Sequence, residues 1–332
     1  VEEDDLIEEG RMEIPEEPGL GLTLDLDAVD AERVRAFFDA SDVLEVDTPL
    51  LSAAAPTEPR IEPVRARVLG DERFLQTSPE FPMKRLLAAG IGDCWQLARV
   101  YRDGERGRWH QPEFDLLEWY RLGCGHHDLM EEVEAVVAAT LAPERPVPRA
   151  EYITYSQAFR RYAGVEPLSA DMEEVRAAAD ENALSPVPGL DDDDREGWLD
   201  HLLTSLVAPR FAPDRLTFLY DWPASQAALA RIDVDDPRVA ARFEAFWGEL
   251  ELANGFHELA DAGEQRARFE AENRTRRAEG GAAVPLDERL LAALEAGLPD
   301  CAGVALGFDR LVMLAAGTDT IDAVLPFPVE RA

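Results

Sequence analysis

Residues 99–120 read RVYRDGERGRWHQPEFDLLEWY, and the rest of the chain can be interpreted around this stretch. An apolar run precedes it at 94–98, and a second run follows a charged loop punctuated by glycine. Two such runs on either side of a loop predict a β-hairpin. Arg102 would end the first strand, and Glu113 and Phe114 would begin the second. This arrangement suits an anionic, aromatic ligand such as a nucleotide, whereas the simpler alternative is that the loop charges are only solvated.

The composition predicts a folded protein with a large core. The chain has 332 residues, 46% of them hydrophobic, which allows one large α/β domain or two smaller ones. No apolar run approaches the roughly 20 residues of a membrane span, and the acidic N-terminus is unlike a signal or transit peptide. Three widely spaced cysteines, Cys94, Cys124 and Cys301, favour reduced thiols. We therefore expect a cytoplasmic protein with no membrane contact.

The charge balance is strongly acidic. The formal net charge is −35, and Lys84 is the single lysine, so almost every cation is an arginine. An acidic surface repels nucleic acid and argues against a large RNA footprint. It is typical of proteins adapted to high salt, so we expect a halophilic acidic surface with its charge spread out and an activity that needs salt for screening.

Several elements are expected around the hairpin. A helix over Asp30 to Ala40, with Asp30 as N-cap, leads into an edge strand over Val43 to Pro49. A short strand over Phe74 to Thr77 leads into a helix over Glu80 to Ala89, with Ser78 as its N-cap and Pro79 at its first position. Capping alone would explain Ser78 and Glu80. Further helices are expected at 126–142, 152–164, 172–182, 198–208, 264–279 and 287–296, and a strand at 216–220.

Two later stretches carry candidate site residues. Asn254-Gly255 is a strong turn signal, so Glu251 and Glu258 would face each other around a turn. Two such carboxylates could hold Mg²⁺ on phosphates, although most acids in so acidic a chain lie on the surface. Residues 303–314 read GVALGFDRLVML, a small-residue strand running into an apolar helix. Arg310 at their junction is a second candidate phosphate ligand, or else a surface arginine beside a core strand.

Other common site patterns are absent from the sequence. There is no Gly-rich phosphate loop and no nucleophile elbow. The five histidines show no metal-ligand spacing; they are His110, His126, His127, His201 and His257.

Taken together, three stretches resemble the ordered motifs of class II aminoacyl-tRNA synthetases. Val43 to Pro49 resembles motif 1, Arg102 to Phe114 motif 2, and Gly303 to Arg310 motif 3. TSPEFPMKRLL (77–87), HQPEFDLLEWY (110–120), ELANGFHEL (251–259) and GVALGFDRLVML (303–314) are similar to the lysyl-tRNA synthetase core. They are more similar still to the paralogues of that enzyme that ligate (R)-β-lysine to elongation factor P. The resemblance covers residues 28–332.

The resemblance implies an α+β fold, the class II synthetase catalytic core, with a six-stranded, mostly antiparallel sheet flanked by helices. It also implies a homodimer formed through motif 1. We expect an acidic N-terminal arm at 1–27 and a catalytic domain at 28–332. Because 27 residues are too few for the OB-fold that reads the anticodon, we expect no such domain and no tRNA partner.

The implied activity is that of an ATP-dependent, AMP-forming ligase that uses Mg²⁺. The catalytic residues would be Arg102, Arg310, Glu251 and Glu258, the last two also as metal ligands. The residues assigned to ATP are Arg102, Asp103, Gly104, Glu105, Gln111, Phe114, Glu251, Leu252, Gly307 and Arg310. Those assigned to the amino-acid substrate are Ser78, Pro79, Glu80, Glu118, Tyr120, Glu258 and Ala305. Glu258 thus has two alternative roles, metal ligand and partner of a substrate amine.

Ala305 bears on which amino acid is used. Lysyl-tRNA synthetases usually have glycine at this position and the β-lysine ligases have alanine, so the resemblance favours (R)-β-lysine. One methyl group can supply about 1–3 kcal/mol of discrimination. Some residues depart from the family pattern: Asp103-Gly104 replaces Asn-Glu, and Gln111 replaces Asn. The alternatives are a synthetase-like ligase of α-lysine with another acceptor and a non-catalytic regulator, though regulators commonly lose the motif arginines and acids kept here.

Overall fold

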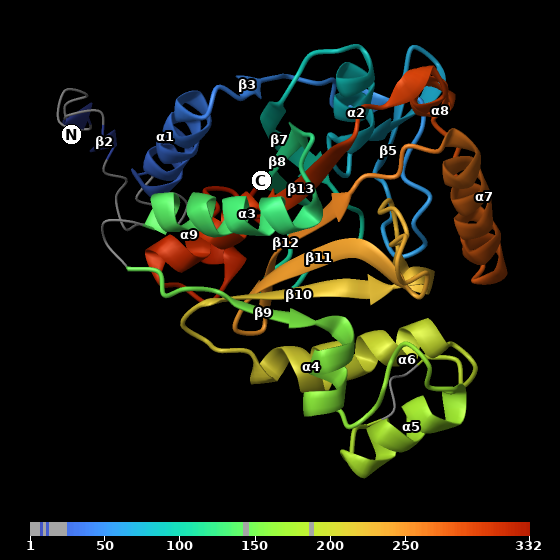
Figure 1. Ribbon diagram of the computed structural model, residues 1–332. Coiled ribbons are helices and arrows are strands. Elements are labelled where there is room, and N and C mark those ends of the chain that lie inside the picture. The colour runs from blue at the N-terminus through green and yellow to red at the C-terminus, as the bar shows by residue number, and fades with distance from the viewer. Residues whose placement is uncertain (1–6, 9–10, 13–24, 142–145, 186–188) are drawn as a thin grey trace.

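An eight-stranded sheet forms the centre of the computed structural model, which describes residues 7–8, 11–12, 25–141, 146–185 and 189–332 (Figure 1). The strand order is β3 (Leu44–Glu45), β7 (Cys94–Tyr101), β8 (Glu113–Leu122), β13 (Cys301–Gly307), β12 (Leu250–His257), β11 (Val239–Trp247), β10 (Leu216–Pro223), β9 (Glu151–Thr154). The six strands from β7 to β10 pair antiparallel. The expected α+β fold is confirmed. The expected count of six is corrected to eight, because β3 and β9 each add a short parallel edge strand.

The predicted hairpin is confirmed as β7 and β8. Its register runs from Cys94 opposite Tyr120 to Tyr101 opposite Glu113. Strand β13 pairs with the other edge of β8 and places Ala305 opposite Glu118. The motif 2 and motif 3 stretches, about two hundred residues apart in the sequence, therefore lie side by side at the middle of the sheet.

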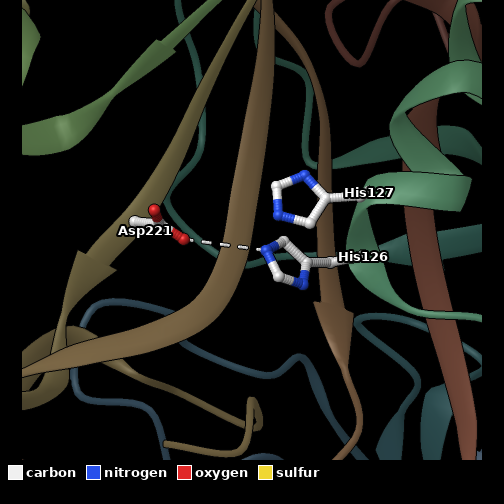
Figure 2. A group of neighbouring side chains, drawn as sticks. All are labelled: His126, His127 and Asp221. Atoms are coloured by element: carbon white, nitrogen blue, oxygen red, sulfur yellow. Dashed lines mark ion pairs between the residues drawn. The ribbon is translucent and has the colours of Figure 1, made fainter. Parts of the chain in front are cut away.

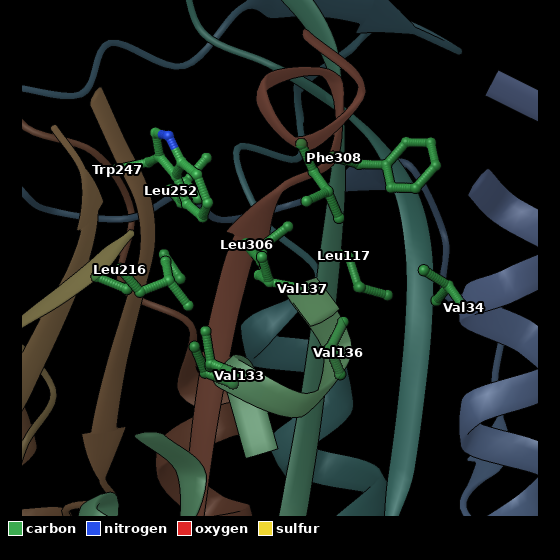
Figure 3. Close-up of a cluster of buried hydrophobic side chains, with 14 of the residues drawn as sticks. Val34, Leu117, Val133, Val136, Val137, Leu216, Trp247, Leu252, Leu306 and Phe308 are labelled. Carbon is green, nitrogen blue, oxygen red and sulfur yellow. The ribbon is translucent and has the colours of Figure 1, made fainter. Parts of the chain in front are cut away.

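Helices cover one face of the sheet and build the main core. They are α1 (Asp25–Ala40), α3 (His126–Leu141) and α9 (Phe308–Ala316). Figure 3 shows Val34 of α1 and Val133 of α3 directed towards Leu117 and Leu306 of the sheet. Successive residues along β8 face opposite sides of the sheet. Leu117 and Trp119 therefore belong to this core, while Glu118 and Tyr120 face away from it.

The other side of the sheet carries a second group of elements, which surround the site. These are α2 (Glu80–Ala88), α7 (Ala262–Ala278), α8 (Glu288–Gly297) and a small sheet of β4 (Leu51–Ser52), β6 (Asp71–Leu75) and β5 (Arg65–Val68) (Figure 1). Tyr120 and Cys301 of the large sheet pack against Met83 of α2 and Leu291 of α8. This packing holds the start of α2 beside β8.

A third group packs against β10 and β11 with its own core. It contains α4 (Tyr155–Tyr162), α5 (Met172–Glu181) and α6 (Arg195–Leu202). The prediction of one helix over 152–164 is wrong at its start, because β9 occupies 151–154 and Thr154 forms a capping box with Gln157. The helix expected at 198–208 begins earlier, at Arg195, because Asp194 caps it; a π turn and a 3₁₀ turn complete it over 203–210.

Two predictions near the N-terminus need correction. Helix α1 begins at Asp25, so Asp30 lies inside it and is not its N-cap. The strand expected over Val43 to Pro49 is reduced to Leu44–Glu45. Most of the expected arm at 1–27 lies outside the described residues, except for a pairing of β1 (Ile7–Glu8) with β2 (Arg11–Met12). The division at residue 27 stays a prediction.

The turn predicted at Asn254-Gly255 is also wrong. Strand β12 runs through both residues, and the reversal lies earlier, at Gly248 between β11 and β12. Gly255 is needed for packing, because a Cβ there would meet the ring of Phe243 at 2.5 Å. Of the helices in the described ranges, none is long and apolar enough to cross a membrane.

Candidate active site

A cavity of about 1440 Å³ opens on the side of the sheet away from α3. Arg102, Phe114 and Glu105 line it from the hairpin, and Gly307 and Arg310 line it from the junction of β13 with α9. Leu252 of β12 also reaches the cavity. The structure thus brings together the two arginines and the aromatic residue that the sequence predicted for an ATP site.

Arg102 is held at the end of the first hairpin strand. Its Nε donates to the carbonyl of Thr77 at 3.4 Å, and its guanidinium lies 5.1 Å from the centre of the Phe114 ring. One terminal nitrogen is 3.6 Å from a carboxylate oxygen of Glu105. The guanidinium is therefore a positioned cation that keeps donors available for an incoming anion.

Arg310 is fixed by groups from two other elements. Its Nη1 donates to the carbonyl of Glu251 at 2.6 Å, and its Nη2 donates to Nε2 of His110 at 2.8 Å. Burial and the neighbouring guanidinium lower the pKa of His110, so the ring stays neutral and can accept this bond. A Cβ at Gly307 would press on the Arg310 stem at 3.2 Å, so the small residue makes room for it.

Some predicted ATP contacts are not brought to the cavity. Asp103 and Gly104 are absent from its lining, and the Asp103 N–H donates to the carbonyl of Glu62 at 2.8 Å. Gln111 lines the cavity, but its amide nitrogen donates to Asp322 at 2.6 Å and its oxygen accepts from the N–H of Val329 at 3.2 Å. The side chain of Gln111 thus anchors the C-terminal segment, which disfavours the predicted contact with ATP.

The metal pair needs a correction. Glu251 and Glu258 are separated by seven positions of extended chain, which places their Cα atoms about 20 Å apart. They cannot share one ion. Glu244 of β11 instead lines the same cavity as Glu251. Burial, and then the charge of Glu251, raise the pKa of Glu244 to about 8, although Arg242 donates to its carboxylate at 2.6 Å and opposes the shift.

A small inner pocket adjoins the cavity and has room for about one water-sized group, 20 Å³. Glu118 lies in it and is 2% exposed. It accepts hydrogen bonds of 2.7 Å from the hydroxyls of Ser78 and Tyr120. Burial raises the pKa of Glu118 to about 8, and the nearby Glu80 adds to the shift. Ser78 also accepts from the N–H of Glu80 at 3.0 Å, so it holds the start of α2 although Pro79 is the N-cap residue.

Lys84 connects the other two carboxylates of the inner pocket. Its Nζ lies 2.5 Å from Glu80 and 2.6 Å from Oε2 of Glu258. Burial alone would lower the pKa of Lys84, but the two carboxylates outweigh it and raise the pKa. Burial raises the pKa of Glu258 to about 7 against the opposing effect of Lys84. Oε1 of Glu258 has no hydrogen-bond partner among the described residues.

Small residues of β13 lie where the large cavity meets the inner pocket. A Cβ at Gly303 would collide with the Tyr120 ring and with Oε1 of Glu258. Ala305 lines both the cavity and the inner pocket, as do Asn254 and Phe256 of β12. Pro79 lines neither space, and its predicted contact with the substrate stays a prediction.

Sequence reasoning missed three residues of the site. Lys84 carried a signal, since it is the single lysine and lies four positions after Glu80 on a helix. No sequence signal marked Glu244, because it is one of 68 acidic residues. Gly303 was seen only as part of a small-residue strand, and its collision with Tyr120 depends on the pairing of β13 with β8.

Comparison with known proteins agrees with this fold. A family model described as tRNA synthetases class II (D, K and N) matches residues 10–331, and the chain belongs to this family. Two relatives are named elongation factor P–(R)-β-lysine ligase, from Klebsiella pneumoniae strain 342 and from Klebsiella pneumoniae subsp. pneumoniae strain ATCC 700721 / MGH 78578. Each is 48% identical over 311 residues, which cover 92% of this chain and 94% of the relative. The resemblance inferred from the sequence is therefore confirmed.

Proposed function

We propose that the protein activates (R)-β-lysine with ATP as an acyl-adenylate and transfers it to a lysine ε-amine of elongation factor P. The acceptor and the amino acid are those in the names of the two relatives. The observation that carries the amino-acid class is the charge of the inner pocket. Glu80, Glu118 and Glu258 against Lys84 leave two negative charges when all are ionised, which matches a substrate with two ammonium groups.

The first step would occur in the large cavity. An oxygen of the substrate carboxylate attacks the α-phosphorus of ATP, a new P–O bond forms, and pyrophosphate leaves with the electron pair of the broken bond. Arg102 would neutralise charge that develops on the α-phosphate, and Phe114 would stack on adenine. Arg310 would bind the outer phosphates from the opposite wall, with neutral His110 as its acceptor.

Glu244 and Glu251 would hold Mg²⁺, and we propose this pair in place of Glu251 with Glu258. The fit is supported by the raised pKa of buried Glu244 beside Glu251, because two carboxylates that face one cavity are stabilised as anions by a cation. When bound, the ion would screen the phosphate charges. Glu258 would keep its second role, with its unpartnered Oε1 accepting from a substrate ammonium.

In the second step the acceptor amine attacks the carbonyl carbon of the adenylate. An amide bond forms, AMP leaves with the electron pair of the broken C–O bond, and the nitrogen loses a proton. The net charge of −35 supports a protein acceptor over tRNA, whose phosphates it would repel. It also supports a halophilic surface, because so many acids need abundant counterions. The free cysteines of the described residues support a cytoplasmic site of action.

We further propose a homodimer through the motif 1 stretch. Leu44 and Leu50, in this stretch and directly after it, are large apolar side chains that are 50% and 42% exposed, and neither lines the substrate cavity. Such clustering marks an interaction surface. Light scattering should give the mass of a dimer, and Leu44→Glu with Leu50→Glu should give a monomer. A monomeric wild-type protein would contradict this.

The transfer reaction is tested by intact-mass spectrometry of elongation factor P. After incubation with the protein, ATP, Mg²⁺ and (R)-β-lysine in high salt, we expect a mass gain of one lysyl residue at one lysine. Arg102→Ala should abolish the gain, and omission of ATP should do the same. No gain with either lysine isomer, under conditions in which the protein forms AMP, would exclude elongation factor P as the acceptor.

A further inference from the structure

A second cluster of ligand-type side chains lies where α3 begins, and none of them lines the substrate cavity. Figure 2 shows His126 and His127 of α3 facing Asp221 of β10. One ligand atom from each residue lies within 4.8 Å of the other two. Two imidazoles and a carboxylate are a common donor set for zinc and related transition metals.

The convergence of the two histidines is unusual for neighbours on a helix. Consecutive helical residues project in directions about 100° apart and do not face each other. Here the two ring centroids are only 4.2 Å apart. The first turn of α3 thus presents both imidazoles to one point, and His127 also packs edge-on against Tyr220 at 5.3 Å between centroids.

The buried histidine lacks a partner. His126 is 7% exposed, and its Nε2 has no hydrogen-bond partner among the described residues. Oδ1 of Asp221 lies 3.7 Å from that nitrogen, too far for a hydrogen bond. A buried polar atom without a partner costs free energy, and so requires an explanation.

The backbone of Asp221 is strained where it meets the histidines. Its φ is +58°, in the left-handed region, and it is the residue at which the β10–β11 register shifts. Such bulges redirect a side chain, and non-glycine residues with positive φ concentrate at functional sites. The bulge turns the Asp221 carboxylate towards the start of α3.

We propose that His126, His127 and Asp221 bind one divalent transition-metal ion of the zinc class. Donors about 2.0–2.1 Å from a tetrahedral ion lie about 3.3 Å apart, so the 3.7 Å pair needs only a small adjustment. Water would complete the coordination. The neighbouring His257 already contacts Asp300 at 3.0 Å and is not needed as a ligand. The ion would tie the start of α3 to β10 on the face opposite the substrate cavity, which is a structural role.

The test uses the full-length protein, stripped of metal and titrated with Co²⁺ and then Zn²⁺. The titration contains excess Mg²⁺ and high salt, which suppress weak binding of Co²⁺ by exposed carboxylates. We expect one Co²⁺ per chain, with the intense visible absorption of a four-coordinate nitrogen-ligated ion, and displacement of Co²⁺ by Zn²⁺. Metal should also raise the melting temperature.

The variant for comparison is His127→Gln with Asp221→Asn. Asparagine tolerates positive φ, so the backbone at 221 should be preserved, and without metal the variant should melt near the wild-type temperature. Its affinity for Co²⁺ should fall at least about 100-fold, whereas His201→Gln, a change of a partly exposed histidine on α6, should have no effect. Equal stoichiometry and affinity in the double variant and the wild type would overturn the proposal, as would a Co²⁺ spectrum of an ion with oxygen ligands alone.

Discussion

Three carboxylates, those of Glu80, Glu118 and Glu258, lie around the buried Lys84, and the proposed substrate depends on this residue-scale feature. Glu118 and Glu258 are almost fully buried, yet the hydroxyls of Ser78 and Tyr120 and the ammonium of Lys84 do not satisfy every acceptor. Burial therefore raises the pKa of Glu118 to about 8 and that of Glu258 to about 7. An amine ligand would restore both carboxylates to their ionised form.

This predicts proton release when a diammonium substrate binds. At pH 7.5 the free protein holds roughly one proton shared over Glu118 and Glu258, and binding should expel it. Calorimetry in buffers of different ionisation enthalpy should report ~1 proton released, and Glu118→Gln should reduce that number. Proton uptake, or no linkage, would contradict the account.

The same shifts set the direction of stability with pH. A carboxyl group whose pKa is raised in the folded protein stabilises it below the unfolded value of 4.5, and that stabilisation is lost as pH rises through 7 to 8. The raised pKa of Lys84 does not change this window, because the lysine is charged in both states below 10.5. The ligand-free protein should thus lose stability between pH 5 and about 8, as measured by thermal unfolding.

Ala305 provides the test of amino-acid choice. Its methyl group lies where the cavity meets the inner pocket, so Ala305→Gly should enlarge the join and shift preference towards α-lysine. We expect the ratio of kcat/KM for (R)-β-lysine over α-lysine to fall by about tenfold or more. An unchanged ratio would show that another residue sets the choice.

At the scale of elements, the paired strands β8, β13 and β12 carry the site. Their order brings Glu118, Ala305 and Asn254 into one row across the sheet. A hydrophobic pattern predicted β7, β8 and most helices, because their faces repeat with regular periods. The prediction of a turn at Asn254-Gly255 failed, because Gly255 lies within a strand and leaves room for the ring of Phe243. Phe243 belongs to a neighbouring strand, so the residues next to Gly255 in the sequence do not indicate this contact.

The candidate site was predictable to a similar extent. Arg102, Phe114, Glu118 and Arg310 could be assigned because the stretches that contain them resemble family motifs. The proximity of Glu244 to Glu251 could not be predicted, because it depends on where the chain reverses between β11 and β12. His126 and Asp221 lie 95 positions apart and are joined only by the bulge in β10, so no spacing in the sequence reveals them.

Gly303→Ala tests the close packing of β13 against β8. Its new methyl group would collide with Tyr120 and Glu258, so we expect a loss of about 1–3 kcal/mol in the free energy of unfolding. The KM for the amino acid should rise more than the KM for ATP. The matched control is Gly125→Ala, whose methyl would meet its neighbours at an ordinary 3.8 Å. Equal effects of the two changes in denaturant titration would contradict the packing argument.

At the scale of the whole molecule, acids divide sharply between surface and site. The chain has 68 acidic residues, and among the side chains the structure describes only five are buried: Glu118, Glu244, Glu258, Asp287 and Asp309. All five line the cavity or its inner pocket. In the proposed function these two groups of acids have different roles: the surface acids keep the protein solvated in salt, and the site acids bind amines and metal.

Surface self-repulsion predicts that salt stabilises the protein. Raising KCl from 0.1 M to above 1 M shortens the Debye length from about 10 Å to about 3 Å and screens the net charge of −35. The melting temperature should rise by several degrees across this range. A flat or falling temperature would show that the exposed ion pairs, which salt weakens, outweigh the repulsion.

The most direct test of the proposed activity is amino-acid-dependent exchange of labelled pyrophosphate into ATP, measured in high salt without any acceptor. It isolates adenylate formation, for which we propose that Arg102, Arg310 and the inner pocket are all needed. The account predicts exchange with (R)-β-lysine, faster than with α-lysine, and its loss in Arg102→Ala and Glu258→Gln. No exchange with either isomer would contradict the assignment of this site to amino-acid activation, and faster exchange with α-lysine would contradict the choice of substrate.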